Sequence, residues 1–318
     1  MSAGLHVESS GSGPPLVLLH GWAMHSGVWG PLVPALALRH RVHAVDLPGH
    51  GRSAALPPTT LDALVDAVAV RFAAEGEPVT VIGWSLGGMV ALRWARRAPQ
   101  QVRRLALVAT TPAFVARADW PHAMAADTLV RFGDELRVSY RLTLQRFLSL
   151  QLAGGGDGRV TRGSGTVDCK ATLAALRRDL FARGEPSPAA LASALAILMD
   201  TDLRAEVPAI AQPCLVVSGE RDTLTPPAAG AWLASALPAG RFVEVAGAGH
   251  VPFLSHPAEF MQALDAFLHE PEGPPRGRIA PSGRDGAQRQ GCTDKPEGPP
   301  RGRIAPSRRD GAQRQGHR

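Results

Sequence analysis

Six short apolar runs, each ending in a glycine-rich or polar turn, limit how this chain can fold more than any other feature. They occupy 15–22, 41–51, 78–85, 103–110, 213–222 and 241–250. Helix-like stretches separate most of them, among them 61–75, 87–98 and 226–237. Strands that are apolar throughout and alternate with helices are typical of a mostly parallel sheet covered by helices on both faces. The sequence therefore predicts an α/β fold.

The interval 112–199 interrupts this alternation, because it shows helical patterns and no convincing strand. Ser187 and Pro188 have the character of an N-cap and a first helical residue, for a helix that ends near Met199. We predict a helical cap over 112–199, inserted above the C-terminal edge of the sheet, with the glycine-rich segment 153–158 as a flexible joint. The sheet domain then comprises 1–111 and 200–270.

The composition changes to Pro, Gly, Arg and Gln from residue 271 onward. The segment 271–291 recurs as 296–316 with a single difference, Gly283 against Arg308. Because such a segment offers little apolar surface to bury, we predict that 271–318 is a disordered, duplicated tail. Its arginines could bind RNA or an anionic surface, but we favour a duplication of non-functional sequence.

The net charge of +6 belongs to this tail, which carries 11 Lys+Arg against 5 Asp+Glu. The remaining residues balance at 23 against 23, so the high isoelectric point does not indicate nucleic-acid binding by the folded part. Cys169, Cys214 and Cys292 are widely spaced and form no CxxC pair, which favours reduced thiols and no metal. With no secretory signal and no run of 18 apolar residues, we expect a cytoplasmic monomer without cofactor.

The pentapeptide Gly83-Trp84-Ser85-Leu86-Gly87 matches the pattern G-x-S-x-G. A β-branched run precedes it and a helical pattern follows it, which is the strand–turn–helix context that this motif requires. A serine in so sharp a turn projects its hydroxyl into a cleft at the positive end of a helix. An ordinary glycine-rich turn is the alternative, but the context favours Ser85 as a nucleophile.

A serine hydroxyl needs a base to remove its proton, and the base needs a third group to fix its tautomer. In this kind of fold the acid and then the histidine follow the serine along the chain, each at the end of a later strand. Asp222 ends one apolar run and His250 ends the next. We predict Ser85, His250 and Asp222 as nucleophile, base and orienting acid.

Glu220 and Asp202 compete with Asp222 for the role of acid. We favour Asp222 because it begins a DTLTP turn that would direct a carboxylate at the site. His256 and His50 are weaker candidates for the base, since the first is expected to cap the last helix and the second lies in a tight turn.

The oxyanion formed during hydrolysis needs backbone N–H donors that are already in place. Leu86, directly after the nucleophile, supplies one of them, and Trp22, beside the flexible Gly21, is predicted to supply the other. His20 is then a structural residue of this loop and no second base.

Five segments together carry a resemblance to a known family: LLHGW, VDLPGHGRS, GWSLGG, GERDTLTP and GAGHVPFLSHPAEF. They resemble the marks of the α/β-hydrolase superfamily. Within it the chain looks like the pimeloyl-[acyl-carrier protein] methyl ester esterases of biotin synthesis, over residues from about 5 to 268. The closer match rests on HGW, GWSLGG, ARADWP (116–121), RFLSLQ (146–151) and HVPFLSHPAEF (250–260).

This resemblance implies an α/β-hydrolase fold, with about eight mostly parallel strands under a helical cap. It implies a serine carboxylesterase that hydrolyses the methyl ester of pimeloyl-[acyl-carrier protein] through an acyl-serine intermediate. It also implies substrate contacts from Trp22, Ser85, Leu86, Phe147, Leu148, Ser149, Leu150, Gln151 and His250. A broad short-chain carboxylesterase, a lactonase, a carbon–carbon bond hydrolase and a non-catalytic ligand receptor remain as alternatives.

The predicted cap can also be interpreted from its own residues. Tyr140, Leu144, Phe147 and Gln151 share one helix face, which either packs on the sheet domain or lines an acyl pocket. Residues 137–183 carry nine Lys+Arg against three Asp. An acidic acyl-carrier protein would suit such a surface, and we predict docking at Arg146 and Arg159. Ordinary solvated helix faces explain the cluster equally well.

Overall fold

A computed structural model describes most of the chain: residues 4–57, 59–152, 159–160, 167–168, 173–174, 176–178, 180, 182–183 and 187–270. The predictions for the joint 153–158, for Cys169 and Cys292, and for the tail 271–318 lie outside the described residues.

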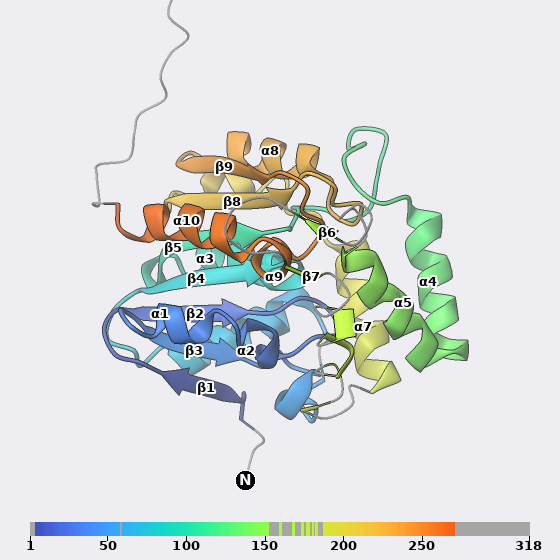
Figure 1. Cartoon of the computed structure of the whole chain (residues 1–318), viewed down its shortest axis with the longest axis horizontal. Helices are drawn as coiled ribbons and strands as arrows, with labels where there is room; N and C mark the ends of the chain where they lie inside the picture. The colour runs from blue at the N-terminus through green and yellow to red at the C-terminus, as the bar shows by residue number, and fades with distance from the viewer. Residues whose placement is uncertain are drawn as a thin grey trace, which may run out of the picture. The chain divides into compact units, whose positions relative to one another are not determined.

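Seven strands form the main sheet of the described chain, in the order β1-β3-β2-β4-β5-β8-β9 (Figure 1). They are β1 (Val7–Ser10), β2 (Pro15–Leu19), β3 (Arg41–Val45), β4 (Val79–Trp84), β5 (Val102–Val108), β8 (Cys214–Gly219) and β9 (Gly240–Val245). Only β1 runs antiparallel to its neighbour, so the sheet is mostly parallel, as predicted. Each of the six apolar runs coincides with one strand to within a residue at its start, and β1 is the strand of this sheet that the apolar runs missed. The count of seven is one below the expected eight or so.

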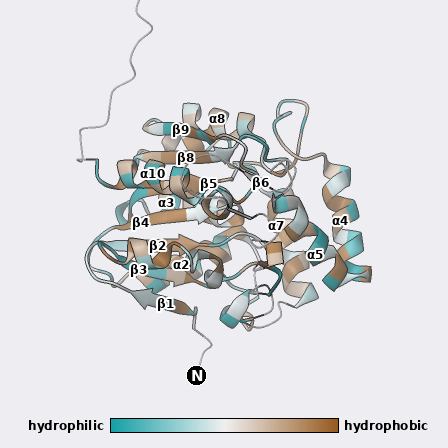
Figure 2. Cartoon of the chain, viewed as in Figure 1, coloured by the Kyte–Doolittle hydropathy of each residue, from teal (hydrophilic) through white to brown (hydrophobic). Residues whose placement is uncertain are grey.

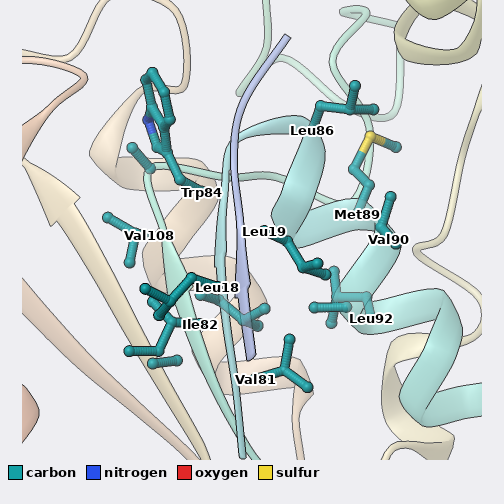
Figure 3. Packing of buried hydrophobic residues seen from close by; sticks show 14 of the residues in the cluster. Leu18, Leu19, Val81, Ile82, Trp84, Leu86, Met89, Val90, Leu92 and Val108 are labelled. Carbon is teal, nitrogen blue, oxygen red and sulfur yellow. The ribbon is translucent and has the colours of Figure 1, made fainter. Parts of the chain in front are cut away.

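The central strands explain why helices must flank the sheet. Every residue of β2, β4 and β8 is buried. Since successive side chains of a strand point to opposite faces, both faces must be covered. Figure 2 shows hydrophobic residues concentrated on strands such as β4, and Figure 3 shows side chains of β2 and β4 meeting those of α3.

The residues predicted as the sheet domain contain the helices α1 (Val33–Leu36), α2 (Leu61–Phe72), α3 (Leu86–Arg97), α8 (Pro227–Ala236), α9 (Pro252–Ser255) and α10 (Pro257–Leu268). Short 3-10 turns occupy Ser26–Trp29, Gly51–Ser53, Pro99–Gln101 and Val207–Ala209. No helix in the described ranges has both the length and the apolar character needed to cross a membrane.

The interval predicted as a cap contains α4 (Ala126–Val138), α5 (Tyr140–Leu152) and α7 (Pro188–Asp200), which lie beyond one end of the strands (Figure 1). The start of α7 is as predicted, because the Ser187 side chain accepts a hydrogen bond from Ala190 N and Pro188 is the first helical residue. The prediction that 112–199 lacks strands was wrong. Strands β6 (Arg159–Val160) and β7 (Val167–Asp168) pair antiparallel, and at two residues each they are too short to show an alternating pattern.

Candidate active site

Ser85 stands in the turn between the end of β4 and the start of α3. Its φ angle is 54°, a left-handed conformation that non-glycine residues adopt rarely and at an energetic cost. The turn leaves no room for side chains on either side. A Cβ on Gly83 would lie 2.5 Å from the carbonyl oxygen of Gly87, and one on Gly87 would lie 2.2 Å from that of Leu19. The two glycines of the motif are therefore required by close backbone contacts.

Asp222 and His250, which follow β8 and β9, are joined by a hydrogen bond of 2.8 Å from His250 Nδ1–H to Asp222 Oδ2. Both side chains are almost fully buried. Because the proton on Nδ1 is held by the carboxylate, Nε2 is left with the lone pair that a general base needs.

The turn after Asp222 surrounds its carboxylate with donors. Thr225 Oγ1 donates to Oδ2 over 2.6 Å, and the backbone amides of Leu224 and Thr225 donate to Oδ1 over 2.8 and 3.0 Å. Burial alone would raise the pKa of Asp222, but the neighbouring His250 and these hydrogen bonds outweigh it and hold the pKa below its usual value. The carboxylate is thus kept ionised beside the imidazole.

The rival acids and bases have other partners. Glu220 accepts a hydrogen bond from Gly247 N over 2.7 Å at the surface. Asp202 forms ion pairs with Arg117 and Arg204 where the cap segment joins the sheet domain. His50 Nδ1–H donates to a backbone carbonyl two residues away. The structure therefore brings only Asp222, among the acids considered, to His250.

The loop after β2 passes directly beside the nucleophile. A Cβ on Gly21 would lie 3.2 Å from the Cβ of Ser85, which is closer than most Cβ contacts, so this loop passes near the serine. Trp22 is the next residue, and Leu86 is the first residue of α3, whose opening amides lack partners within the helix. The two residues whose amides are predicted to bind the oxyanion thus lie next to Ser85, Leu86 along the chain and Trp22 in the adjoining loop.

His20 belongs to the support of this loop, in agreement with its predicted structural role. Its Nδ1–H donates to Gly21 O over 2.8 Å, and its Nε2 accepts from Leu47 N over 2.9 Å. Complete burial lowers the pKa of His20 to about 3, so the ring is neutral near pH 7. Both ring nitrogens are used, which leaves none for a second base.

A cavity lies between the residues predicted as the sheet domain and the cap helices. Four of the predicted substrate contacts line it: Trp22, Ser85, Phe147 and His250. The other lining residues were not predicted: Phe114, Met124, Thr128, Leu129, Phe132, Leu195, Leu198 and Leu224. Spacings of three between Leu129 and Phe132 and between Leu195 and Leu198 could have indicated inward faces of α4 and α7.

The other predicted contacts whose side chains the structure describes do not line the cavity. Leu86 and Leu148 are buried in the core. Ser149 Oγ donates to Gln145 O within α5. Gln151 is fully buried, and its backbone carbonyl accepts a hydrogen bond from His250 N over 2.9 Å. The side chain of Leu150 lies outside the described residues.

Both interpretations of the α5 face hold in part. Leu144 is buried in the hydrophobic core, and Tyr140 packs against that core. Phe147 instead lines the cavity. The ring of Trp22 meets that of Phe147 at a centroid distance of 5.0 Å and that of Phe132 at 5.3 Å. Trp22 Nε1–H also donates to Leu191 O of α7 over 3.0 Å. This tryptophan therefore connects the oxyanion loop to α4, α5 and α7.

Of the residues predicted to dock a carrier, Arg146 is exposed and lies 3.6 Å from Glu135. The side chain of Arg159 lies outside the described residues. Arg183 is turned inward, where it pairs with Glu8 and donates to Ser26 Oγ. Within the described ranges no group of three or more His, Cys, Asp or Glu residues could hold a metal ion.

The amino-acid sequence is similar to those of known α/β hydrolases. A model of the alpha/beta hydrolase fold family matches residues 14–257. Pimeloyl-[acyl-carrier protein] methyl ester esterases from Nitrosomonas europaea and Xanthomonas axonopodis pv. citri are 45% and 46% identical over 265 residues, 83% of this chain and 100% and 98% of theirs.

Solved structures give the same fold. An esterase from Exiguobacterium antarcticum superimposes with a TM-score of 0.72 at 21% identity, over 84% of this chain and 96% of its own. An enol-lactonase from Burkholderia xenovorans LB400 gives 0.70 at 25% identity, over the same shares. Because one fold thus carries both an esterase and a lactonase, the fold alone leaves the substrate open.

Proposed function

Because this chain belongs to the alpha/beta hydrolase fold family, and within it to the pimeloyl-[acyl-carrier protein] methyl ester esterases, we propose that it hydrolyses that methyl ester in biotin synthesis. The observation that carries the proposal is that His250, which is hydrogen-bonded to Asp222, lines the same cavity as Ser85. Relatives with 45% and 46% identity, covered over 100% and 98% of their length, support the substrate.

In the proposed reaction His250 Nε2 takes the proton of Ser85 as its Oγ bonds to the ester carbonyl carbon. The backbone N–H groups of Trp22 and Leu86 stabilise the resulting oxyanion. When the tetrahedral intermediate collapses, the bond to the methoxy oxygen breaks, and His250 passes its proton to the leaving methanol. Asp222 stays ionised and stabilises the imidazolium that forms in between.

The second half of the reaction repeats these steps with water. His250 takes a proton from the water as the oxygen attacks the acyl-serine carbonyl. The bond to Ser85 Oγ then breaks, the serine regains its proton from His250, and the free carboxylic acid leaves and loses its own proton to solvent. Ser85 and His250 thus return to their starting protonation states, and no cofactor is consumed.

The cavity wall suits the acyl part of such a substrate. The residues that α4, α5 and α7 contribute are almost all apolar, as a chain of methylene groups requires: Thr128, Leu129, Phe132, Phe147, Leu195 and Leu198. The reacting ester would lie at the polar end of the cavity, between Ser85 and His250.

The carrier protein is the proposed partner, and the cap is the surface proposed to receive it. Arg146 lies on the exposed side of α5, with the exposed apolar side chains of Val138 and Leu142 before it in the chain. An acidic partner with some apolar surface complements such a face. Arg159 is proposed as a second contact. We further propose that the protein is a monomer and that it is cytoplasmic. The free thiol of Cys214 is in keeping with that reducing compartment.

The test compares kcat/KM for a carrier-linked pimeloyl methyl ester, a free pimeloyl methyl ester and a small lactone. We expect the carrier-linked ester to be preferred at least about tenfold, since docking adds binding energy that the free ester lacks. Equal values for both esters would favour a broad esterase, and preference for the lactone a lactonase. Absence of both turnover and fluorophosphonate labelling of Ser85 would favour a ligand receptor.

A further inference from the structure

Trp84, the variable residue before the nucleophile in G-x-S-x-G, makes a contact that the proposed reaction has not used. It is the last residue of β4, and its side chain is 1% exposed. Its Nε1–H donates to the backbone carbonyl of His250 over 2.9 Å. Figure 3 shows Trp84 and the side chains of α3 on opposite sides of the strand. The strand that presents the nucleophile is thereby tied to the main chain of the base.

The peptide groups of His250 are held from two directions. Its N–H donates to Gln151 O at the end of α5, and its carbonyl accepts from Trp84. Of these two anchors, only Trp84 belongs to the sheet domain. The hydrogen bond to Asp222 fixes the imidazole but leaves the backbone of the loop to be fixed by other contacts.

Packing holds the Trp84 indole in the orientation that this bond requires. Its ring meets that of Phe253 edge to face at a centroid distance of 5.3 Å, and Phe253 stacks on Trp29 at 4.6 Å. The indole does not line the cavity. Any influence of Trp84 on the reaction must therefore pass through His250 or the turn at Ser85.

We propose that Trp84 is a positioning residue, whose indole N–H fixes the main chain of His250 relative to Ser85. The inference rests on the proposed roles of Ser85 and His250. Its physical basis is that proton transfer requires the imidazole within hydrogen-bond reach of the serine hydroxyl, and displacement by about 1 Å can cost about 100-fold in rate. This hydrogen bond explains why position 84 of the segment GWSLGG holds a tryptophan, whereas the filling of space alone would not require an indole N–H.

The experiment compares Trp84→Phe with Trp94→Phe. Trp94 is a matched control, because it is 0% exposed and its Nε1–H donates to Gln101 Oε1 over 2.7 Å, away from the cavity. For a small methyl ester we expect Trp84→Phe to lower kcat about 10- to 100-fold with KM changed less than about twofold. Fluorophosphonate labelling should slow in parallel. Trp94→Phe should keep kcat and labelling even where its melting temperature falls as far.

A second substitution separates the N–H from the shape of the ring. Benzothienylalanine at position 84 keeps the two fused rings but carries sulfur in place of the N–H, so packing against Phe253 is preserved. We expect the same loss of kcat with little change in melting temperature. Full activity of this analogue, or equal losses of kcat in both phenylalanine variants, would overturn the proposal. If the wild-type protein were labelled at Ser85 but hydrolysed no methyl ester, that result would instead contradict the proposed esterase function.

Discussion

The sheet domain and the cap contribute to the same cavity in different ways. Ser85 directly follows β4, and Asp222 and His250 follow β8 and β9 within a few residues. The cap wall instead comes from α4, α5 and α7, which are separated along the chain and meet only in the fold. The polar groups proposed for the chemistry are thus fixed by short local segments, whereas the acyl surface depends on how three helices pack.

The contacts within the two regions differ as well. Asp222 accepts four hydrogen bonds, each with its own direction and with a length of 2.6–3.0 Å. In the wall, Phe132 and Phe147 meet at a centroid distance of 5.6 Å through contacts that have little directional preference. We therefore expect the sheet domain to tolerate almost no change at the site and the cap to tolerate many.

The largest effects should come from the residues at the strand ends. Ser85→Ala and His250→Ala should each lower kcat by about 10⁴-fold or more, and Asp222→Asn by somewhat less, because the three groups act as a unit. Steady-state hydrolysis of a small ester measures this. Glu220→Gln is the control and should leave kcat almost unchanged. Substantial turnover by Ser85→Ala would rule out the serine mechanism.

A smaller effect is expected from the cap wall. Phe147→Ala should lower kcat/KM for a seven-carbon acyl ester by about 10- to 100-fold, since it removes apolar surface from the acyl chain. The kcat/KM for an acetate ester, whose acyl group is too short to reach along the wall, should fall much less. Val138→Ala is the control, because Val138 belongs to the cap but is 86% exposed. If Phe147→Ala impaired both esters equally, the aromatic wall would support the site without contacting the acyl chain.

The same difference explains what the sequence could predict. In motifs at the strand ends, such as GWSLGG and the DTLTP turn at Asp222, a few consecutive residues determine the geometry of the turn. The predicted Asp222–His250 pair meets in the structure. The wall was predicted only at Phe147, on the helix that carried a family segment. Spacings of three could have indicated the inward helix faces that carry Leu129 and Leu198. That these faces meet at one cavity is set by packing between distant segments, which no local pattern records. The two-residue strands β6 and β7 were missed because so short a pair leaves no periodic signal.

Acid sensitivity should also belong to the sheet domain, because His20 and His50 are buried there while the described cap holds no buried histidine. Burial lowers the pKa of His20 to about 3 and that of His50 to about 4. In the unfolded chain a histidine takes up its proton near pH 6.5, so between about pH 6.5 and pH 4 the unfolded state binds more protons. The free energy of unfolding should therefore fall as pH falls through this window, by about 1.4 kcal/mol per pH unit for each histidine.

Denaturant unfolding between pH 7 and pH 4.5 measures this slope. Replacing His50 by Asn, which can still donate to the carbonyl of Pro48, should make the slope shallower by about one proton. An unchanged slope would mean that His50 does not take part in the acid response.

The smallest effect, and the one that sharpens the comparison most, concerns the outer side of the cap. Arg146 is 64% exposed, so Arg146→Glu should leave the fold and the cavity intact. If the cap docks an acidic carrier, the KM for the carrier-linked ester should rise several-fold while kcat and activity on a small neutral ester stay unchanged, because surface charges act on encounter and orientation. Adding Arg159→Glu should increase the rise in KM. Added salt should raise the wild-type KM, since exposed charges are screened over about 10 Å at 0.1 M.

The matched control is Arg96→Glu, which reverses an exposed charge at the end of α3, outside the cap. Equal losses on both substrates would assign Arg146 to the stability of the cap, and no loss on either would mean that this arginine has no part in docking.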